Sequence, residues 1–194
     1  MKDKITNILM IGVGGQGTVL SSNILSLAAM FDGHDVKKNE IHGMSQRGGS
    51  VFSHVRFGKK VYSPVIPEGE ADVLFSLEEI ETLRWLQFLK PDGSIICLDE
   101  KILPSNLNSY PEGTLEFLQQ NYKNIHLVDP QILQKELNNV KVLNVALLGA
   151  LSKLIDISGS SWIKAIREFV PAGTEELNIK AFEAGKQLLS YSKE

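Results

Sequence analysis

The sequence is poor in cysteine, and this scarcity limits the chemistry that the chain can carry alone. Cys97 is the single cysteine among 194 residues. One thiol excludes an intrachain disulfide, and it excludes a four-cysteine zinc or iron–sulfur site built by this chain by itself. Cys97 lies in the apolar run 94–98, which predicts a buried, unreactive thiol rather than a nucleophile.

The sequence also lacks long hydrophobic runs and a strong excess of either charge. No apolar stretch approaches the ~20 residues that cross a bilayer, so we expect no membrane partner. The formal net charge is −3, so the chain is not expected to have the broad basic surface that binds nucleic acid. The polar residues 1–4 lead directly into the first predicted strand, without the pattern of a signal peptide. These features predict a cytoplasmic protein.

The hydrophobic pattern predicts one α/β domain over residues 1–194. This length and a hydrophobic fraction of 43% suit a single core. Apolar runs that predict strands alternate with segments of helical periodicity. The alternation predicts a doubly wound, mainly parallel sheet with an antiparallel hairpin and C-terminal helices. The predicted strands are 7–11, 34–38, 51–57, 61–63, 71–76, 94–98 and 125–128. The predicted helices are 18–31, 77–89 (capped by Ser76), 115–122, 130–137, 142–155, 162–169 and 175–191.

A glycine turn follows the first predicted strand and precedes the first predicted helix. Gly12, Gly14 and Gly17 have the G-x-G-x-x-G spacing, with Gly15 and Gln16 between them. Such glycines permit a tight turn, let the backbone approach a phosphate, and allow close packing of helix and strand. The helix N-terminus then offers unpaired N–H groups and the positive end of a dipole. The pattern favours a ligand or phosphate cradle, and a purely structural turn remains the alternative.

A dinucleotide would require an acidic residue about 20 positions after the turn, at the end of the second strand. Asp35 and Glu40 are near that distance. Asp35, however, is expected to begin the strand, and Lys37 and Lys38 dominate its end. Two lysines favour a phosphate over a bare ribose diol. NAD therefore remains an alternative that the residues support poorly.

A second glycine-rich loop contains a cation beside flexible backbone. It has Gln46 and Arg47 followed by Gly48 and Gly49. Arg47 could bind a carboxylate or phosphate through two hydrogen bonds, and the two glycine N–H groups could form an anion-binding nest. Alternatively, Arg47 pins the loop to a carbonyl or to a partner subunit. Both interpretations stay open.

Acid–base and metal candidates are few. His42 lies in the polar segment before the second loop, whereas His54 lies on an alternating strand, where a structural role is the stronger expectation. Neither histidine has a neighbouring nucleophile. The sequence has no Gly-x-Ser-x-Gly elbow, no Walker lysine loop and no metal-spaced histidine pair. We therefore expect no catalytic residue and no metal ligand from this chain.

The two glycine segments together resemble a known family. The turn GVGGQG at 12–17 and the segment EIHGMSQRGGSV at 40–51 are similar to the gamma-type domain of 2-oxoacid:ferredoxin oxidoreductases. The stretch 42–44 favours the small (beta) subunit of the indolepyruvate type. The resemblance covers nearly the whole chain and is least distinctive at 102–119. Further matching stretches are 62–64, 66–72, 89–93, 144, 147–150, 178 and 181–185.

The resemblance implies an activity that the spacing of residues does not reveal. Enzymes of this family oxidatively decarboxylate a 2-oxoacid, attach the acyl group to coenzyme A, and pass electrons through iron–sulfur clusters to ferredoxin. In the indolepyruvate type, thiamine diphosphate and the clusters are expected on the larger alpha subunit. The chain would then bind no tight cofactor of its own, and coenzyme A would be its co-substrate. The single cysteine of this chain is consistent with iron–sulfur clusters that are carried by the alpha subunit.

The resemblance also assigns roles to the two glycine segments. Gly14, Gly15, Gln16 and Gly17 would line the phosphate-proximal wall of a coenzyme A site. Gln46 and Arg47 would face either coenzyme A or the thiamine-bearing subunit.

These observations lead to one preferred hypothesis and several alternatives. We expect an accessory subunit of an indolepyruvate or arylpyruvate ferredoxin oxidoreductase, inactive alone and able to form a homodimer when isolated. A close alternative is the gamma subunit of a 2-oxoglutarate, pyruvate or branched-chain 2-oxoacid oxidoreductase. A free-standing NAD(P)-binding reductase and a nucleotide-binding module are the alternatives from other classes.

Overall fold

The computed structural model describes residues 4–42, 49–104 and 107–189, which form strands and helices around one mixed sheet. The strands are β1 (Thr6–Val13), β2 (Asp35–His42), β3 (Ser50–Gly58), β4 (Ala71–Ser76), β5 (Leu89–Leu98) and β6 (Ile125–Val128). The helices are α1 (Thr18–Phe31), α2 (Glu79–Arg84), α3 (Thr114–Asn121), α4 (Pro130–Leu137), α5 (Leu143–Leu151), α6 (Gly159–Phe169) and α7 (Glu175–Leu188), with short 3₁₀ turns η1 (Leu86–Phe88) and η2 (Val140–Val142).

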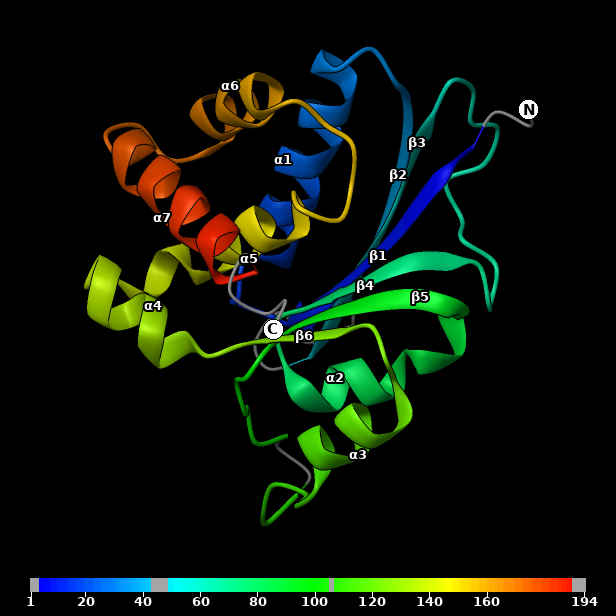
Figure 1. Ribbon diagram of the computed structural model, residues 1–194, viewed down its shortest axis with the longest axis vertical. Helices are drawn as coiled ribbons and strands as arrows, with labels where there is room; N and C mark the ends of the chain where they lie inside the picture. The colour runs from blue at the N-terminus through cyan, green and yellow to red at the C-terminus, as the bar shows by residue number, and fades with distance from the viewer. Residues whose placement is uncertain (1–3, 43–48, 105–106, 190–194) are drawn as a thin grey trace.

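The sheet has the strand order β2-β3-β1-β4-β5-β6. Strand β3 runs antiparallel to both of its neighbours, whereas β1, β4, β5 and β6 pair in parallel. Helices α1, α5, α6 and α7 lie on one face of the sheet, and α2 and α3 lie on the other (Figure 1). The prediction of an α/β, mainly parallel sheet with an antiparallel part and C-terminal helices is confirmed.

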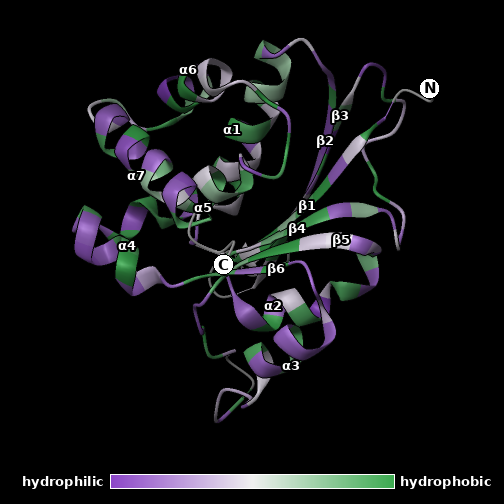
Figure 2. Cartoon of the chain, in the orientation of Figure 1, coloured by the Kyte–Doolittle hydropathy of each residue, from purple (hydrophilic) through white to green (hydrophobic). Residues whose placement is uncertain are grey.

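The first strand is apolar on both sides because both faces of the sheet are covered. Ile8 and Met10 belong to the core beneath α1, α5 and α7, whereas Leu9 and Ile11 belong to the smaller core toward α2 and α3. All four side chains are fully buried. Figure 2 shows the same distribution, with apolar residues concentrated along the central strands and α5 and polar residues on the outer turns of α3, α4 and α7. A continuous apolar run is typical of a strand buried on both faces.

Helices α5 and α7 approach each other closely enough that only glycine fits at the contact. A Cβ atom at Gly149 would lie 1.9 Å from the carbonyl oxygen of Phe182, and one at Gly185 would lie 1.7 Å from that of Ala146. Backbone meets backbone at this crossing, so neither neighbour can rotate away. The close packing positions the N-terminus of α5 beside the glycine turn.

The antiparallel part of the sheet differs from the predicted hairpin. Residues 61–63 form no strand, and β3 pairs instead with β2 and β1. Strand β2 also extends past the predicted end at residue 38 and includes residues 39–42. Both edges of β3 are therefore occupied, and no edge is left for a strand at 61–63.

Two local predictions around α2 were wrong. The N-cap of α2 is Glu78 rather than Ser76, and its carboxylate accepts a hydrogen bond from the N–H of Glu81 at 2.8 Å. The helix ends at Arg84, and β5 begins at Leu89. Pro91 and Gly93 lie within β5 at an irregularity where the pairing with β4 shifts register. Parallel pairing with β4 thus overrides the turn preference of proline and glycine.

Candidate functional site

The glycine turn after β1 requires glycine at two positions for different reasons. Gly15 has φ 103° and Gly17 has φ 86°, both in the left-handed region that side chains disfavour. A Cβ at Gly15 would meet nothing within 4 Å, so its surroundings are open. A Cβ at Gly17 would lie 2.5 Å from Nδ2 of Asn144. Gly15 therefore serves the backbone conformation, and Gly17 also admits the side chain of Asn144.

The remaining glycines of the turn hold neighbouring segments together. A Cβ at Gly12 would lie 2.7 Å from Oγ1 of Thr18, so this glycine makes room for the first residue of α1. The N–H of Gly14 donates to the carbonyl oxygen of Gly49 at 2.9 Å. This bond joins the turn to the end of the second glycine-rich loop. The N–H of Gly14 is thus committed to the protein itself.

The side chain of Gln16 joins the carboxyl ends of β1 and β4. Its Oε1 accepts the N–H of Val13 at 2.7 Å, and its Nε2 donates to the carbonyl oxygen of Leu77 at 2.6 Å. Sequence reasoning placed Gln16 on the wall of a ligand site. The structure shows that its amide closes the turn from inside through these two bonds.

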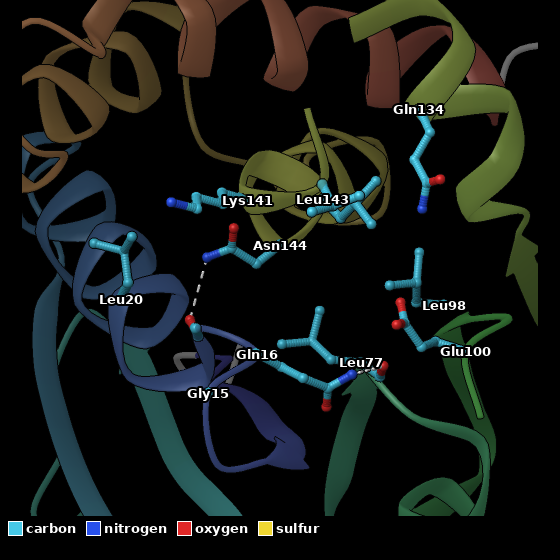
Figure 3. A pocket seen from close by; sticks show the side chains of 12 residues that line it. Gly15, Gln16, Leu20, Leu77, Leu98, Glu100, Gln134, Lys141, Leu143 and Asn144 are labelled. Carbon is cyan, nitrogen blue, oxygen red and sulfur yellow. Dashed lines mark hydrogen bonds between the residues drawn. The ribbon is translucent and has the colours of Figure 1, made fainter. Parts of the chain in front are cut away.

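A pocket of about 580 Å³ opens beside the turn (Figure 3). Its walls come from the turn, from α1, from the segments that follow β4 and β5, and from α4, η2 and α5. The volume lies within the range of small-molecule sites. Its lining residues are Gly15, Gln16, Gly17, Leu20, Leu77, Leu98, Glu100, Gln134, Val140, Lys141, Leu143 and Asn144.

Opposite charges lie on opposite sides of this pocket. Lys141 is on the side of Leu20 and α1, whereas Glu100 is on the side of Leu98 and Gln134 (Figure 3). Burial raises the pKa of the Glu100 carboxyl, and the nearby negative charge of Glu78 adds to the effect. The pocket therefore has a lysine on the side of α1 and an acid on the opposite side.

Asn144 connects α5 with the glycine turn across more than a hundred residues of sequence. Its Nδ2 lies 3.3 Å from the carbonyl oxygen of Gly17 and 3.3 Å from Oγ of Ser21. The side chain is buried at the start of the otherwise apolar helix α5. An asparagine in such a helix was the one local signal of this contact. Nothing local in the sequence marked Lys141 or Gln134 as lining residues of this pocket.

Part of the second predicted site lies outside the described residues. Gln46, Arg47 and Gly48 belong to the segment 43–48, and Gly49 is placed by its bond to Gly14. His54 is buried, and its Nδ1 accepts the N–H of Ile66 at 3.2 Å. Burial, with a smaller contribution from the charge of Arg56, lowers the pKa of His54. His54 thus has the structural role that its position predicted.

The sheet topology does not favour a dinucleotide. Strand β3 lies between β1 and β2, so β2 is two strand spacings, about 10 Å, from the glycine turn's own strand. Asp35 begins β2, at the opposite end from the turn, and binds Lys37 and the N–H of Val61. Lys38 forms an ion pair with Glu40. Neither acid occupies the position that binds a ribose in a dinucleotide fold.

Residues 4–42, 49–104 and 107–189 contain neither a cluster of metal-binding side chains nor a membrane-spanning helix. No cluster of three or more histidine, cysteine, aspartate or glutamate side chains there could hold a metal ion. No helix in the same ranges is long and apolar enough to cross a membrane.

Comparisons with known proteins agree with the fold and with the glycine segments. Residues 7–188 match the family described as pyruvate ferredoxin/flavodoxin oxidoreductase. Indolepyruvate oxidoreductase subunit IorB of Thermococcus kodakarensis is 38% identical over 188 residues, which cover 92% of this chain and 93% of the relative. The IorB subunit of Archaeoglobus fulgidus is 36% identical over 192 residues, covering 92% of each chain.

Solved structures show the same architecture. The gamma subunit of a keto/oxoacid ferredoxin oxidoreductase from Geobacter sulfurreducens superposes with a TM-score of 0.71 at 25% identity, covering 95% of this chain and 99% of that one. A 2-oxoglutarate:ferredoxin oxidoreductase from Magnetococcus marinus, with 2-oxoglutarate, coenzyme A and succinyl-CoA bound, superposes with a TM-score of 0.76 at 19% identity. The match covers 97% of this chain and 32% of the Magnetococcus chain.

The family match spans nearly the whole chain, and the IorB relatives share 32–38% of its residues. The chain therefore belongs to the pyruvate ferredoxin/flavodoxin oxidoreductase family, as a gamma-type subunit of a 2-oxoacid:ferredoxin oxidoreductase similar to IorB.

Proposed function

We propose that this chain is the accessory subunit of an indolepyruvate or arylpyruvate ferredoxin oxidoreductase and that its glycine-turn pocket binds coenzyme A. Thiamine diphosphate and the iron–sulfur clusters are carried by a larger alpha subunit, which decarboxylates the 2-oxoacid and passes electrons to ferredoxin. In this proposal residues 1–194 form one gamma-type domain. The observation that carries it is the pocket of about 580 Å³ between the open Gly15 and Lys141.

The polar side of the pocket suits the phosphates of coenzyme A. Helix α1 has Gly17 as its N-cap without a side-chain hydrogen bond, so its first N–H groups are available to an anion. Lys141 adds a positive charge on the same side. The open surroundings of Gly15 allow close approach of a phosphate to the backbone. The acid Glu100 lies on the opposite wall, away from where phosphates would bind.

The apolar part of the pocket suits the rest of the molecule. Leu20, Leu77, Leu98 and Leu143 line it. Adenine and the pantetheine chain both bury apolar surface, and apolar walls with a few polar groups are typical of cofactor sites. Bound coenzyme A has precedent in the Magnetococcus enzyme, in which this chain superposes on 32% of the longer chain.

The second glycine-rich loop receives a different role in this proposal. Gln46 and Arg47 would contact either coenzyme A or the thiamine-bearing subunit, and the N–H groups of Gly48 and Gly49 would form an anion-binding nest. The bond between Gly14 and Gly49 brings the end of this loop to the turn, which supports a shared site. Arg47→Ala should weaken coenzyme A use or assembly with the alpha subunit while the isolated chain still folds. A variant with normal assembly and normal coenzyme A kinetics would remove Arg47 from the site.

The decisive experiment uses Lys141→Ala in the complex reconstituted with its alpha subunit. Removing one lysine–phosphate interaction should raise the KM for coenzyme A about tenfold, because hydrogen bonds to charged groups are worth about 1.5–3 kcal/mol. The KM for the 2-oxoacid should not change. Lys135→Ala, an exposed lysine of α4 that does not line the pocket, is the matched control. Equal coenzyme A parameters in both variants would refute the pocket assignment.

A second candidate function differs in the 2-oxoacid. The KorC subunit of a 2-oxoglutarate synthase from Methanothermobacter marburgensis is 27% identical over 190 residues. A substrate series of indolepyruvate, phenylpyruvate, 2-oxoglutarate, pyruvate and 2-oxoisovalerate with the reconstituted complex distinguishes these activities. Preference for 2-oxoglutarate would replace the indolepyruvate assignment and leave the accessory role intact.

A thermal shift of the isolated chain with NADH but not with coenzyme A would instead support the reductase or nucleotide-binding alternative.

A further inference from the structure

The outer edge of β2 is a long, regular strand edge. Strand β2 is terminal in the sheet, and within the described residues its only strand partner is β3. The pairing is continuous over eight residues, from Asp35 opposite Gly58 to His42 opposite Val51. The other edge strand, β6, has four residues. A long edge without a proline or a register shift can pair with another strand through its free N–H and C=O groups.

The side chains of β2 are those of a strand that is open to solvent. Residues 35–40 are all partly exposed, and Ile41 is 42% exposed. By contrast, six of the nine positions of β3 are buried, because strands flank it on both edges. Pairing with another strand would cover the exposed side chain of Ile41.

Symmetry restricts how the β2 strands of two copies could pair. A two-fold axis perpendicular to the sheet makes the strands antiparallel and places one residue opposite its own copy. With the axis at Lys37, Lys38 or Glu40, identical charges would face each other, which is destabilising. With the axis at Val36 or at Ile41, only a few residues of β2 could pair. The axis at Asn39 avoids both problems.

The register centred on Asn39 also brings opposite charges together. Lys38 of each copy then lies opposite Glu40 of the other, and Lys37 lies opposite Ile41. Within its own chain Lys38 contacts Glu40 and Asn23 of α1, so its ammonium group already lies on the α1 face of the sheet. Residues directly opposite in an antiparallel pair share a face, so both ion pairs would form there.

We propose that two copies of this chain associate through antiparallel pairing of their β2 strands, with Asn39 on the two-fold axis. The pairing joins the two sheets into one and forms two Lys38–Glu40 ion pairs between the copies. The charge pattern of β2 selects this partner and this register. The interface is separate from the glycine-turn pocket, so it does not depend on the coenzyme A proposal.

Cysteine cross-linking tests both the interface and its register. In the Asn39→Cys variant the two thiols would lie on strands paired directly opposite, with Cα atoms about 5 Å apart, which suits a disulfide. In the control Ile41→Cys the two thiols would be offset by four residues, about 13 Å. The native Cys97 is fully buried and does not compete. Mild oxidation of the full chain should link Asn39→Cys into a dimer and leave Ile41→Cys unlinked.

A charge variant gives an independent measurement. Asn39→Asp places two carboxylates face to face on the axis and should weaken dimerisation about tenfold or more in sedimentation velocity. Asn108→Asp, the same change in an exposed loop, should leave dimerisation unchanged. The proposal is overturned if the wild-type chain stays monomeric at several hundred micromolar. Linking by Ile41→Cys alone, or equal dimerisation of Asn39→Asp and wild type, would also overturn it.

Discussion

Replacing Gly149 by alanine should destabilise the protein, even though alanine is the better helix former. Gly149 lies in α5 where that helix crosses α7, and a Cβ there would lie 1.9 Å from the carbonyl oxygen of Phe182. Ordinary contacts of a Cβ begin at 3.4 Å. The two helices would therefore have to separate by about 1.5 Å at this point.

The expected magnitude follows from two opposing effects. Alanine gains about 1 kcal/mol of helix propensity over glycine. Overpacking costs about 1–3 kcal/mol, and more where the obstacle is backbone that cannot change rotamer. Because the obstacle is the backbone of α7, we expect a net loss of about 2 kcal/mol in the free energy of unfolding. For a chain of this size, such a loss lowers Tm by about 4–8 °C.

Urea unfolding and differential scanning calorimetry of the isolated chain measure this loss directly. Gly159→Ala is the matched control, because Gly159 is the first residue of α6 and a Cβ there would meet nothing within 4 Å. The control should be neutral or slightly stabilising. A Gly149→Ala variant as stable as wild type would show that α5 and α7 do not need this close contact. The reasoning about their packing would then be wrong.

Three further predictions follow from single residues. Gly15→Ala should lower the free energy of unfolding in urea by about 1 kcal/mol or more, because Gly15 has φ 103° in open surroundings. Gly15→Asn should lose less stability, and equal stability of wild type and both variants would contradict this reasoning. Burial, with the neighbouring Asp99, raises the pKa of the Glu79 carboxyl from 4.5 to about 8. The folded state therefore keeps a proton that the unfolded state releases, and stability falls as pH rises from about 4.5 to 8. Glu79→Gln should flatten this part of the stability curve, and an unchanged slope would exclude Glu79 as its source. Burial also raises the pKa of Cys97 to about 12, so Ellman's reagent at pH 8 should label it only after denaturation, and rapid labelling of the folded chain would contradict its burial.

Elements with strong local signals were predicted at their observed positions. The first helix, β4 and α4 have the predicted bounds, and β1 contains the predicted strand. In each case the signal is local: Gly17 precedes α1, and Asp129 with Pro130 begins α4. The turn between β1 and α1 was predictable for the same reason. Its glycine spacing describes a backbone path that few residues can follow.

Elements whose form depends on distant partners were predicted less well. Pro91 and Gly93 indicate a turn when read locally, but β5 passes through them because it pairs with β4 on one side. Residues 61–63 alternate like a strand, yet β1 and β2 occupy both edges of β3. Strand pairing is a long-range interaction, so local propensity cannot decide it.

Local sequence patterns were enough to predict an α/β protein with a glycine turn at its first strand, and the two glycine segments indicated its family. The surroundings of the turn depend on tertiary packing. The amide of Gln16 is bound to Val13 and Leu77 inside the protein. Asn144 of α5 contacts Gly17 of the turn, and Lys141 lines the pocket beside it. Backbone conformation is encoded within a few neighbouring residues, whereas a pocket is formed by side chains that come together only when distant helices and strands pack.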